Sequence, residues 1–223
     1  MTNNITEIQL LEKKIDELTS DEMMFVHLST SYSPITVKNA ILRSNLSFIY
    51  QNIQHSLSNE YSKQLIPYIS LCAILDQLGT CYNRKDKSEP RFQNGIKRCL
   101  YYLGEFSEDD EIIDVIYALR NGLLHNVSLS SYIVNKNKFY HFRYNKDING
   151  IYEPAENAWD GNYETLDTGR ERYTTSINVE NFRDMVFGCL SKAQELNQNS
   201  QLELRLDDGT RQLFFDYVRS IPK

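Results

Sequence analysis

An arginine, an asparagine and a histidine stand close together in the segment Arg120-Asn121-Gly122-Leu123-Leu124-His125. A histidine titrates close to neutral pH, so it can remove or return a proton there. An arginine can hold a phosphate through two hydrogen bonds and stabilise negative charge that grows in a transition state. These side chains suit RNA cleavage, in which the ribose 2′-hydroxyl is an internal nucleophile and no metal is needed in principle. Asn121 could orient His125 or contact the phosphate.

The asparagine directly after the arginine makes this pattern specific, because an arginine followed by a histidine at this spacing is common by chance. The motif also ends a long amphipathic helix that follows several bundle-forming helices. In these features the chain resembles the HEPN superfamily, whose signature is an arginine, a polar residue and a histidine at an R-x4-6-H spacing. The resemblance covers about residues 36–126 and the helix near 181–197. It implies that Arg120, Asn121 and His125 are the catalytic residues of a ribonuclease.

The spacing spreads these residues over a wide polar arc. On a straight helix Arg120 and His125 lie about 140° apart, whereas Asn121 and His125 share a face. Tyr117 falls between the arginine and the histidine, and we take it as a candidate substrate contact. A compact site is easier to build where two copies of the helix meet at a two-fold axis. The resemblance implies such a homodimer, in which one His125 would act as base and the other as acid.

Other interpretations of the motif stay open. A cation in the last turn of a helix is favourable against the helix dipole, and Asn121-Gly122 could be a helix-end turn without chemistry. The alternative function is a non-catalytic HEPN interaction or dimerisation module that binds a partner protein or a nucleotide. Some HEPN toxins carry a tyrosine two residues after the histidine, where a paired nucleotidyltransferase modifies it. This position is Val127, so we do not expect that partner, although another regulatory protein partner stays open.

A second candidate lies on the strand predicted over Phe139–Tyr144. His141 and Arg143 share one face of this strand, and the aromatic residues at its even positions share the other. His141 and Arg143 could therefore stack and hold RNA bases as substrate-binding residues. The alternative is an amphipathic hairpin that packs its aromatic residues on the helical bundle.

The remaining pattern predicts the elements that must position these residues. Apolar residues at helical spacing predict helices over 5–18, 36–57, 62–83, from after Pro90 to about 103, from Ser107 through the motif, and over 181–197. Strands are predicted over 132–135, 139–144 and 173–179, with a loop over 145–172 and a hairpin or short helix near the C-terminus. The fold class predicted is mainly α. We expect one domain over residues 1–223: an HEPN-type helical bundle (about 36–126 and 179–199) with a small β-rich insertion at about 131–178.

Composition limits the classes of function. The 223 residues carry a net charge of −6, which argues against an extended, nonspecific nucleic-acid surface but leaves room for a local basic cleft. The four cysteines form no CxxC pair, the N-terminus shows no secretion signal, and the longest apolar stretch is too short to span a bilayer. We therefore expect a cytoplasmic protein with no membrane segment. No spacing typical of zinc, calcium or nucleotide cofactors occurs, so we expect no metal and no cofactor.

These observations lead to one functional prediction. The chain is expected to be a metal-independent endoribonuclease that acts on RNA as a homodimer. The resemblance suggests a toxin or phage-defence role.

Overall fold

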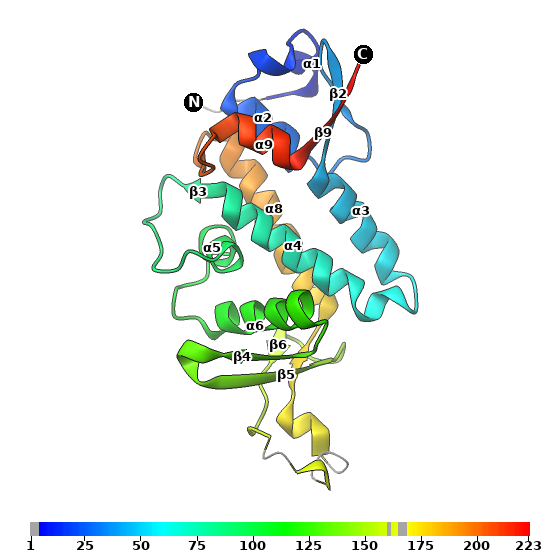
Figure 1. Ribbon diagram of the computed structural model, residues 1–223, viewed down its shortest axis with the longest axis vertical. Helices are drawn as coiled ribbons and strands as arrows, with labels where there is room; N and C mark the ends of the chain where they lie inside the picture. The colour runs from blue at the N-terminus through cyan, green and yellow to red at the C-terminus, as the bar shows by residue number, and fades with distance from the viewer. Residues whose placement is uncertain (1–4, 160–161, 165–168) are drawn as a thin grey trace.

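The structure is a computed structural model that describes residues 5–159, 162–164 and 169–223. It is elongated, with one sheet at each end and a helical middle (Figure 1). The chain is 52% helical and 16% strand. Its strands form a three-stranded sheet of order β1-β2-β9, a two-stranded sheet β3-β8 and a four-stranded sheet of order β4-β5-β7-β6.

The long helix α4 (Ile66–Cys81) lies at the centre of the helical middle. It is apolar over a wide arc and carries Pro67 in its first turn, where the missing N–H costs nothing. It contacts four other helices: α3 (Asn45–Leu57), α5 (Gly95–Tyr102), α6 (Glu111–Asn126) and α8 (Val179–Gln198). The crossing with α5 is close, since a Cβ atom on Gly79 would lie 1.8 Å from the carbonyl oxygen of Gly95.

One end of the molecule joins the N-terminal and C-terminal segments. It contains α1 (Glu7–Leu10), the 3-10 helix η1 (Ile15–Glu17), α2 (Ser20–Leu28), β1 (Ile35–Thr36), β2 (Ala40–Ser44), α9 (Gly209–Tyr217) and β9 (Val218–Pro222). Strand β2 pairs with β1 on one side and along its whole length with β9 on the other. Figure 1 shows α2 and α9 side by side next to this sheet, in agreement with their contacts.

The other end is a sheet that packs on α6. It contains β4 (Ser130–Ile133), the 3-10 helix η3 (Val134–Lys136), β5 (Lys138–Tyr144), β6 (Tyr152–Glu153), the 3-10 helix η4 (Arg170–Tyr173) and β7 (Thr175–Ile177). Strands β4 and β5 are antiparallel, whereas β5 and β7 run parallel from Phe142 onward. Tyr140 and Phe142 are buried on the side that packs against the helices. Three further described elements lie elsewhere: η2 (Ser62–Gln64) before α4, and the paired strands β3 (Tyr82–Arg84) and β8 (Leu202–Leu204).

The prediction of a mainly α, HEPN-type helical bundle was wrong. The described part of the chain is mixed α and β, and its three sheets include one that joins residues 35–44 to residues 218–222. The segment predicted as one helix over 36–57 begins as strand β2, where Ala40, Leu42 and Ser44 alternate inward. Ser44 then caps α3 by accepting the Leu46 N–H at 3.0 Å. The periodicity was misleading because the partner strand β9 lies far away in the sequence, and its pairing decides the local structure.

The length and hydropathy of the described helices can be compared with what a membrane-spanning helix requires. None of the helices in the ranges that the structure describes is both long and apolar enough to cross a membrane.

Candidate functional site

Helix α6 carries the Arg-Asn-His motif in its last two turns, and its Arg120 points towards α4. The guanidinium donates from Nε and Nη2 to Oδ2 of Asp76, at 2.9 and 2.6 Å. Asp76 lies in the second half of α4, so this ion pair ties the two helices together. The pair is partly covered, with 19% of the Arg120 side chain and 24% of the Asp76 side chain exposed.

The third nitrogen of Arg120 joins the other two residues of the motif. Nη1 donates to Oδ1 of Asn121 at 3.2 Å and lies 2.8 Å from Nε2 of His125. The motif residues therefore meet within a single chain, although they are spread around the helix. On a helical wheel the Cα atoms of Arg120 and His125 lie far apart, but the arginine side chain is long enough to reach the histidine.

The hydrogen-bond network fixes the form of the imidazole. A guanidinium can only donate, so Nε2 of His125 accepts and the ring hydrogen lies on Nδ1. The imidazole is neutral in this arrangement and its residue is exposed. A general base must be unprotonated, so a neutral His125 has the required form.

The chain turns sharply just after the motif. Val127 has a φ of 50°, in the left-handed region that a β-branched residue rarely adopts. The Ser128 N–H returns to the carbonyl oxygen of Gly122 at 2.9 Å. A Cβ atom on Gly122 would lie 2.6 and 2.7 Å from the carbonyl oxygens of Ser128 and Ser130. The glycine of the motif is thus required by the turn that leads into β4.

Cys72 lies one helical turn before Asp76 and is fully buried. Burial raises the pKa of its thiol well above the ordinary value, and the charge of Asp76 adds to the rise, while that of Arg120 opposes it. The thiol beside the site is therefore an unreactive, protonated packing group.

Tyr117, the candidate substrate contact, belongs to a neighbouring cluster between α5 and α6. The ammonium of Lys97 lies 4.6 Å from the centre of its ring and 2.6 Å from Oδ1 of Asp114. Lys136 approaches the same carboxylate at 3.3 Å. The ring is half-buried and packs against the core, so Tyr117 supports the helix pair and is not itself in the Arg120 network.

His141 and Arg143 lie elsewhere. They occupy the outer face of β5, while Tyr140 and Phe142 are buried on its inner face. Arg143 donates from Nε to the Ser176 hydroxyl of β7 at 2.8 Å. Since α6 lies between α4 and this sheet (Figure 1), the structure does not bring His141 and Arg143 to the Arg120 network.

Sequence reasoning missed Asp76, which lies 44 residues before Arg120. A signal was present, because this carboxylate interrupts an otherwise apolar helix. A charged residue in such a place is usually paired.

The chain was also compared with known proteins. No protein-family model, curated protein or solved structure matches it significantly. The function is therefore inferred from the geometry of the site. In the part of the chain that the structure describes, no three histidine, cysteine, aspartate or glutamate side chains gather as a group that could hold a metal ion.

Proposed function

We propose that this protein is a metal-independent endoribonuclease that cleaves RNA through attack of the 2′-hydroxyl on the adjacent phosphate. The observation that carries the proposal is the meeting of Arg120 Nη1 with both Asn121 and His125. A cation for the phosphate and a base for the hydroxyl proton thereby lie within one hydrogen bond of each other.

In this proposal each residue of the network has a role. Asp76 holds one edge of the Arg120 guanidinium through Nε and Nη2 and leaves Nη1 on the side of His125. A substrate phosphate would take the place of the imidazole at Nη1, which frees Nε2 of His125 to accept the 2′-hydroxyl proton. Asn121 then holds Arg120 from the other side. The 5′-oxygen of the next nucleotide leaves with a proton, and the products carry a 2′,3′-cyclic phosphate and a 5′-hydroxyl.

The leaving oxygen needs an acid, and we propose that a second copy of the chain supplies it as its own His125. The end of α6 supports such a homodimer, because two apolar residues beside His125 are exposed: Leu124 at 38% and Val127 at 70%. We also propose a cytoplasmic location, which four buried, free cysteines support. A toxin or phage-defence role, with a regulatory protein partner, belongs to the same proposal.

A second candidate function is favoured by one observation. Arg120 is already ion-paired with Asp76, which lowers its capacity to attract a phosphate. A non-catalytic module that binds a partner protein or a nucleotide through the exposed end of α6 would keep this pair for stability alone.

The two candidates are separated by incubating a mixed RNA with the protein in EDTA. Wild type is compared with His125→Ala and with the matched control His55→Ala, since His55 is an exposed histidine near the end of α3. The nuclease proposal predicts cleavage by wild type and His55→Ala and its loss in His125→Ala. Equal cleavage by all three proteins, or cleavage by none, would contradict it.

A further inference from the structure

A chain of five aromatic rings runs over the outer face of the β4–β5 hairpin and the segment that follows β6. Neighbouring ring centres lie between 4.7 and 6.0 Å apart, in the order Tyr132, Phe139, His141, Trp159 and Tyr163. Phe139 and His141 are stacked, whereas Trp159 meets both of its neighbours edge-on. Contiguous rings of this kind offer π-faces to a ligand.

These rings are not part of the protein core. Tyr132 is 46% exposed, Phe139 56% and Tyr163 77%, whereas Tyr140 and Phe142 on the inner face are buried. The two aromatic sets of one strand therefore have different environments. The inner set satisfies the packing of the sheet on α6, and the outer set remains open to a partner.

The surface is hollowed on both sides of His141 and Trp159. A pocket of about 640 Å³ lies between β5 and residues 154–159, and a smaller one of about 290 Å³ lies between the α6–β4 turn and η4. Both are lined by three of the same aromatic residues: His141, Trp159 and Tyr173. Pockets of this size accommodate a nucleoside-sized group.

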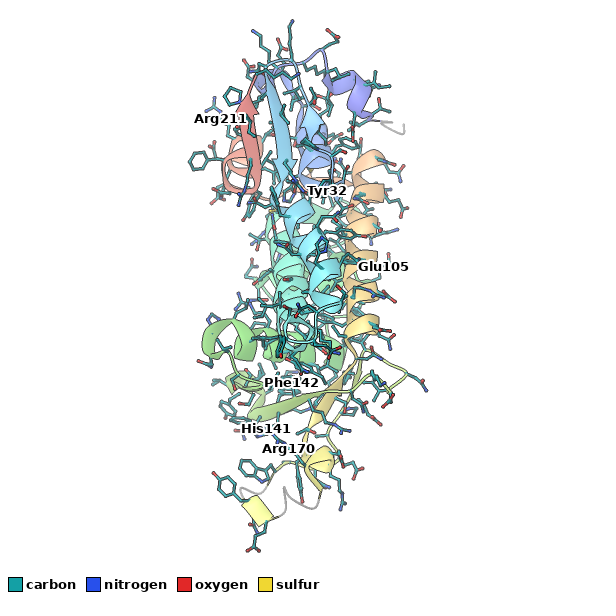
Figure 2. All side chains as sticks on the ribbon, turned by 90° about the vertical axis from the view of Figure 1, so that its right-hand side faces the viewer. Tyr32, Glu105, His141, Phe142, Arg170 and Arg211 are labelled. Carbon is teal, nitrogen blue, oxygen red and sulfur yellow. The ribbon has the colours of Figure 1, made fainter. Side chains whose placement is uncertain are left out.

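Within the described ranges, one cation beside these rings has no carboxylate partner. Arg170 is exposed and lines the smaller pocket. Partial burial of His141 lowers the pKa of its imidazole, and the nearby positive charge of Arg170 lowers that pKa further. Figure 2 shows the two side chains near each other at this end of the molecule. The other cations around the pockets are paired, Lys138 with Glu111 and Arg172 with Glu156. Among the described residues, Arg170 has no such ion pair.

We propose that this surface binds single-stranded RNA, with an unpaired base stacked on the aromatic chain and one neighbouring phosphate held by Arg170. The choice of RNA rests on the proposed nuclease function, whereas the site itself is built mainly from the β4–β5 hairpin and the segment after β6 and does not include the Arg120 network. Stacking on exposed aromatic side chains is how proteins hold unpaired bases without reading their sequence. Because most charges here are paired, stacking contributes more to affinity than phosphate attraction does.

Trp159 makes the proposal directly measurable, because it is the only tryptophan of the chain. The His125→Ala protein (residues 1–223), whose RNA would stay intact, is titrated with a short mixed-sequence single-stranded RNA while tryptophan fluorescence is recorded. The single strand is expected to quench Trp159, and a duplex of the same sequence is not. The logarithm of affinity should fall with the logarithm of salt at a slope of about −0.7, as one phosphate contact requires.

Two surface substitutions test the residues. Phe139→Ala and Arg170→Glu should each weaken binding by about 10-fold, as loss of one stacked ring or one phosphate contact implies. The matched controls are Phe215→Ala and Arg211→Glu on α9, which carry an exposed aromatic ring and an exposed arginine far from the pockets. Tyr132→Ala serves in place of Phe139→Ala should circular dichroism show that the latter is unfolded.

The outcomes separate this inference from the nuclease proposal. No quenching, equal quenching by duplex RNA, or equal loss in the control variants would overturn the inference even if cleavage occurs. Equal quenching by single-stranded DNA would overturn the choice of RNA, because stacking and one phosphate contact do not involve the 2′-hydroxyl. Quenching that depends on Phe139 and Arg170 in a protein that never cleaves RNA would support the inference and overturn only the nuclease.

Discussion

His27 on α2 should make the protein sensitive to mild acid. The side chain is fully buried, and burial lowers the pKa of its imidazole from 6.5 to about 3. Its Nε2 lies 2.8 Å from the Gln77 amide nitrogen, and its Nδ1 contacts the Tyr82 hydroxyl. Since the amide nitrogen can only donate, Nε2 accepts and Nδ1 donates to the hydroxyl. The folded protein therefore holds a neutral histidine whose two nitrogens are both occupied.

The sign and size of the effect follow from proton linkage. The unfolded chain binds a proton at His27 below about pH 6.5, and the folded chain does not until about pH 3. The free energy of unfolding therefore falls as the pH drops through this window. Each pH unit is worth about 1.4 kcal/mol, so His27 alone should remove about 2 kcal/mol between neutral pH and about pH 5.

Urea unfolding at a series of pH values measures this effect. Wild type should lose this stability, whereas His27→Gln, which cannot titrate, should be less stable at neutral pH but change little down to about pH 5. His55→Gln is the control, because it removes an exposed histidine and should follow wild type. A His27→Gln protein that loses as much stability as wild type over the same pH range would show that His27 is not the group responsible.

Three further substitutions test the surroundings of the motif. Gly122→Ala should lower the free energy of unfolding in urea by about 1–3 kcal/mol, because its Cβ would meet two carbonyl oxygens. The control Gly188→Ala, at an uncrowded position in the middle of α8, should raise it by up to about 1 kcal/mol. Equal effects of the two substitutions would contradict this. Val127→Gly should raise the free energy of unfolding by about 0.5 kcal/mol. Glycine adopts the positive φ without the steric strain of valine, and this gain exceeds the entropy cost of glycine at this exposed position. A loss of stability would argue against strain at Val127. Asp76→Asn should slow RNA cleavage at least ~10-fold, because Arg120 loses the carboxylate that orients it, and an unchanged rate would show that the pair has no positioning role.

Helices and strands could be predicted from the sequence where the spacing of nearby apolar residues determines them. The helix that ends in the motif, the strand over 138–144 and the helix over 179–198 all occur near their predicted positions. The alternation of His141 and Arg143 with buried aromatic residues also holds, because a strand places successive side chains on opposite faces.

Features that depend on distant parts of the chain could not be predicted from the sequence. Strand β2 was taken as helix because its pairing with β9 leaves no local trace, and this pairing is one reason why the fold is not a helical bundle. The Asp76–Arg120 pair needed the crossing of α4 and α6 to be known. The aromatic chain through Trp159 depends on how the segment after β6 folds back over β5, which periodicity does not describe.

The nuclease proposal assigns catalysis of the 2′-hydroxyl attack to His125 and Arg120. The most direct test is to identify the chemical ends of RNA fragments formed by the 223-residue protein in EDTA. Catalysis by these residues predicts 2′,3′-cyclic phosphate and 5′-hydroxyl ends from wild type, no cut at a 2′-deoxy position, and no such ends from His125→Ala. Fragments with 5′-phosphate ends, or the same cyclic ends from His125→Ala, would contradict it.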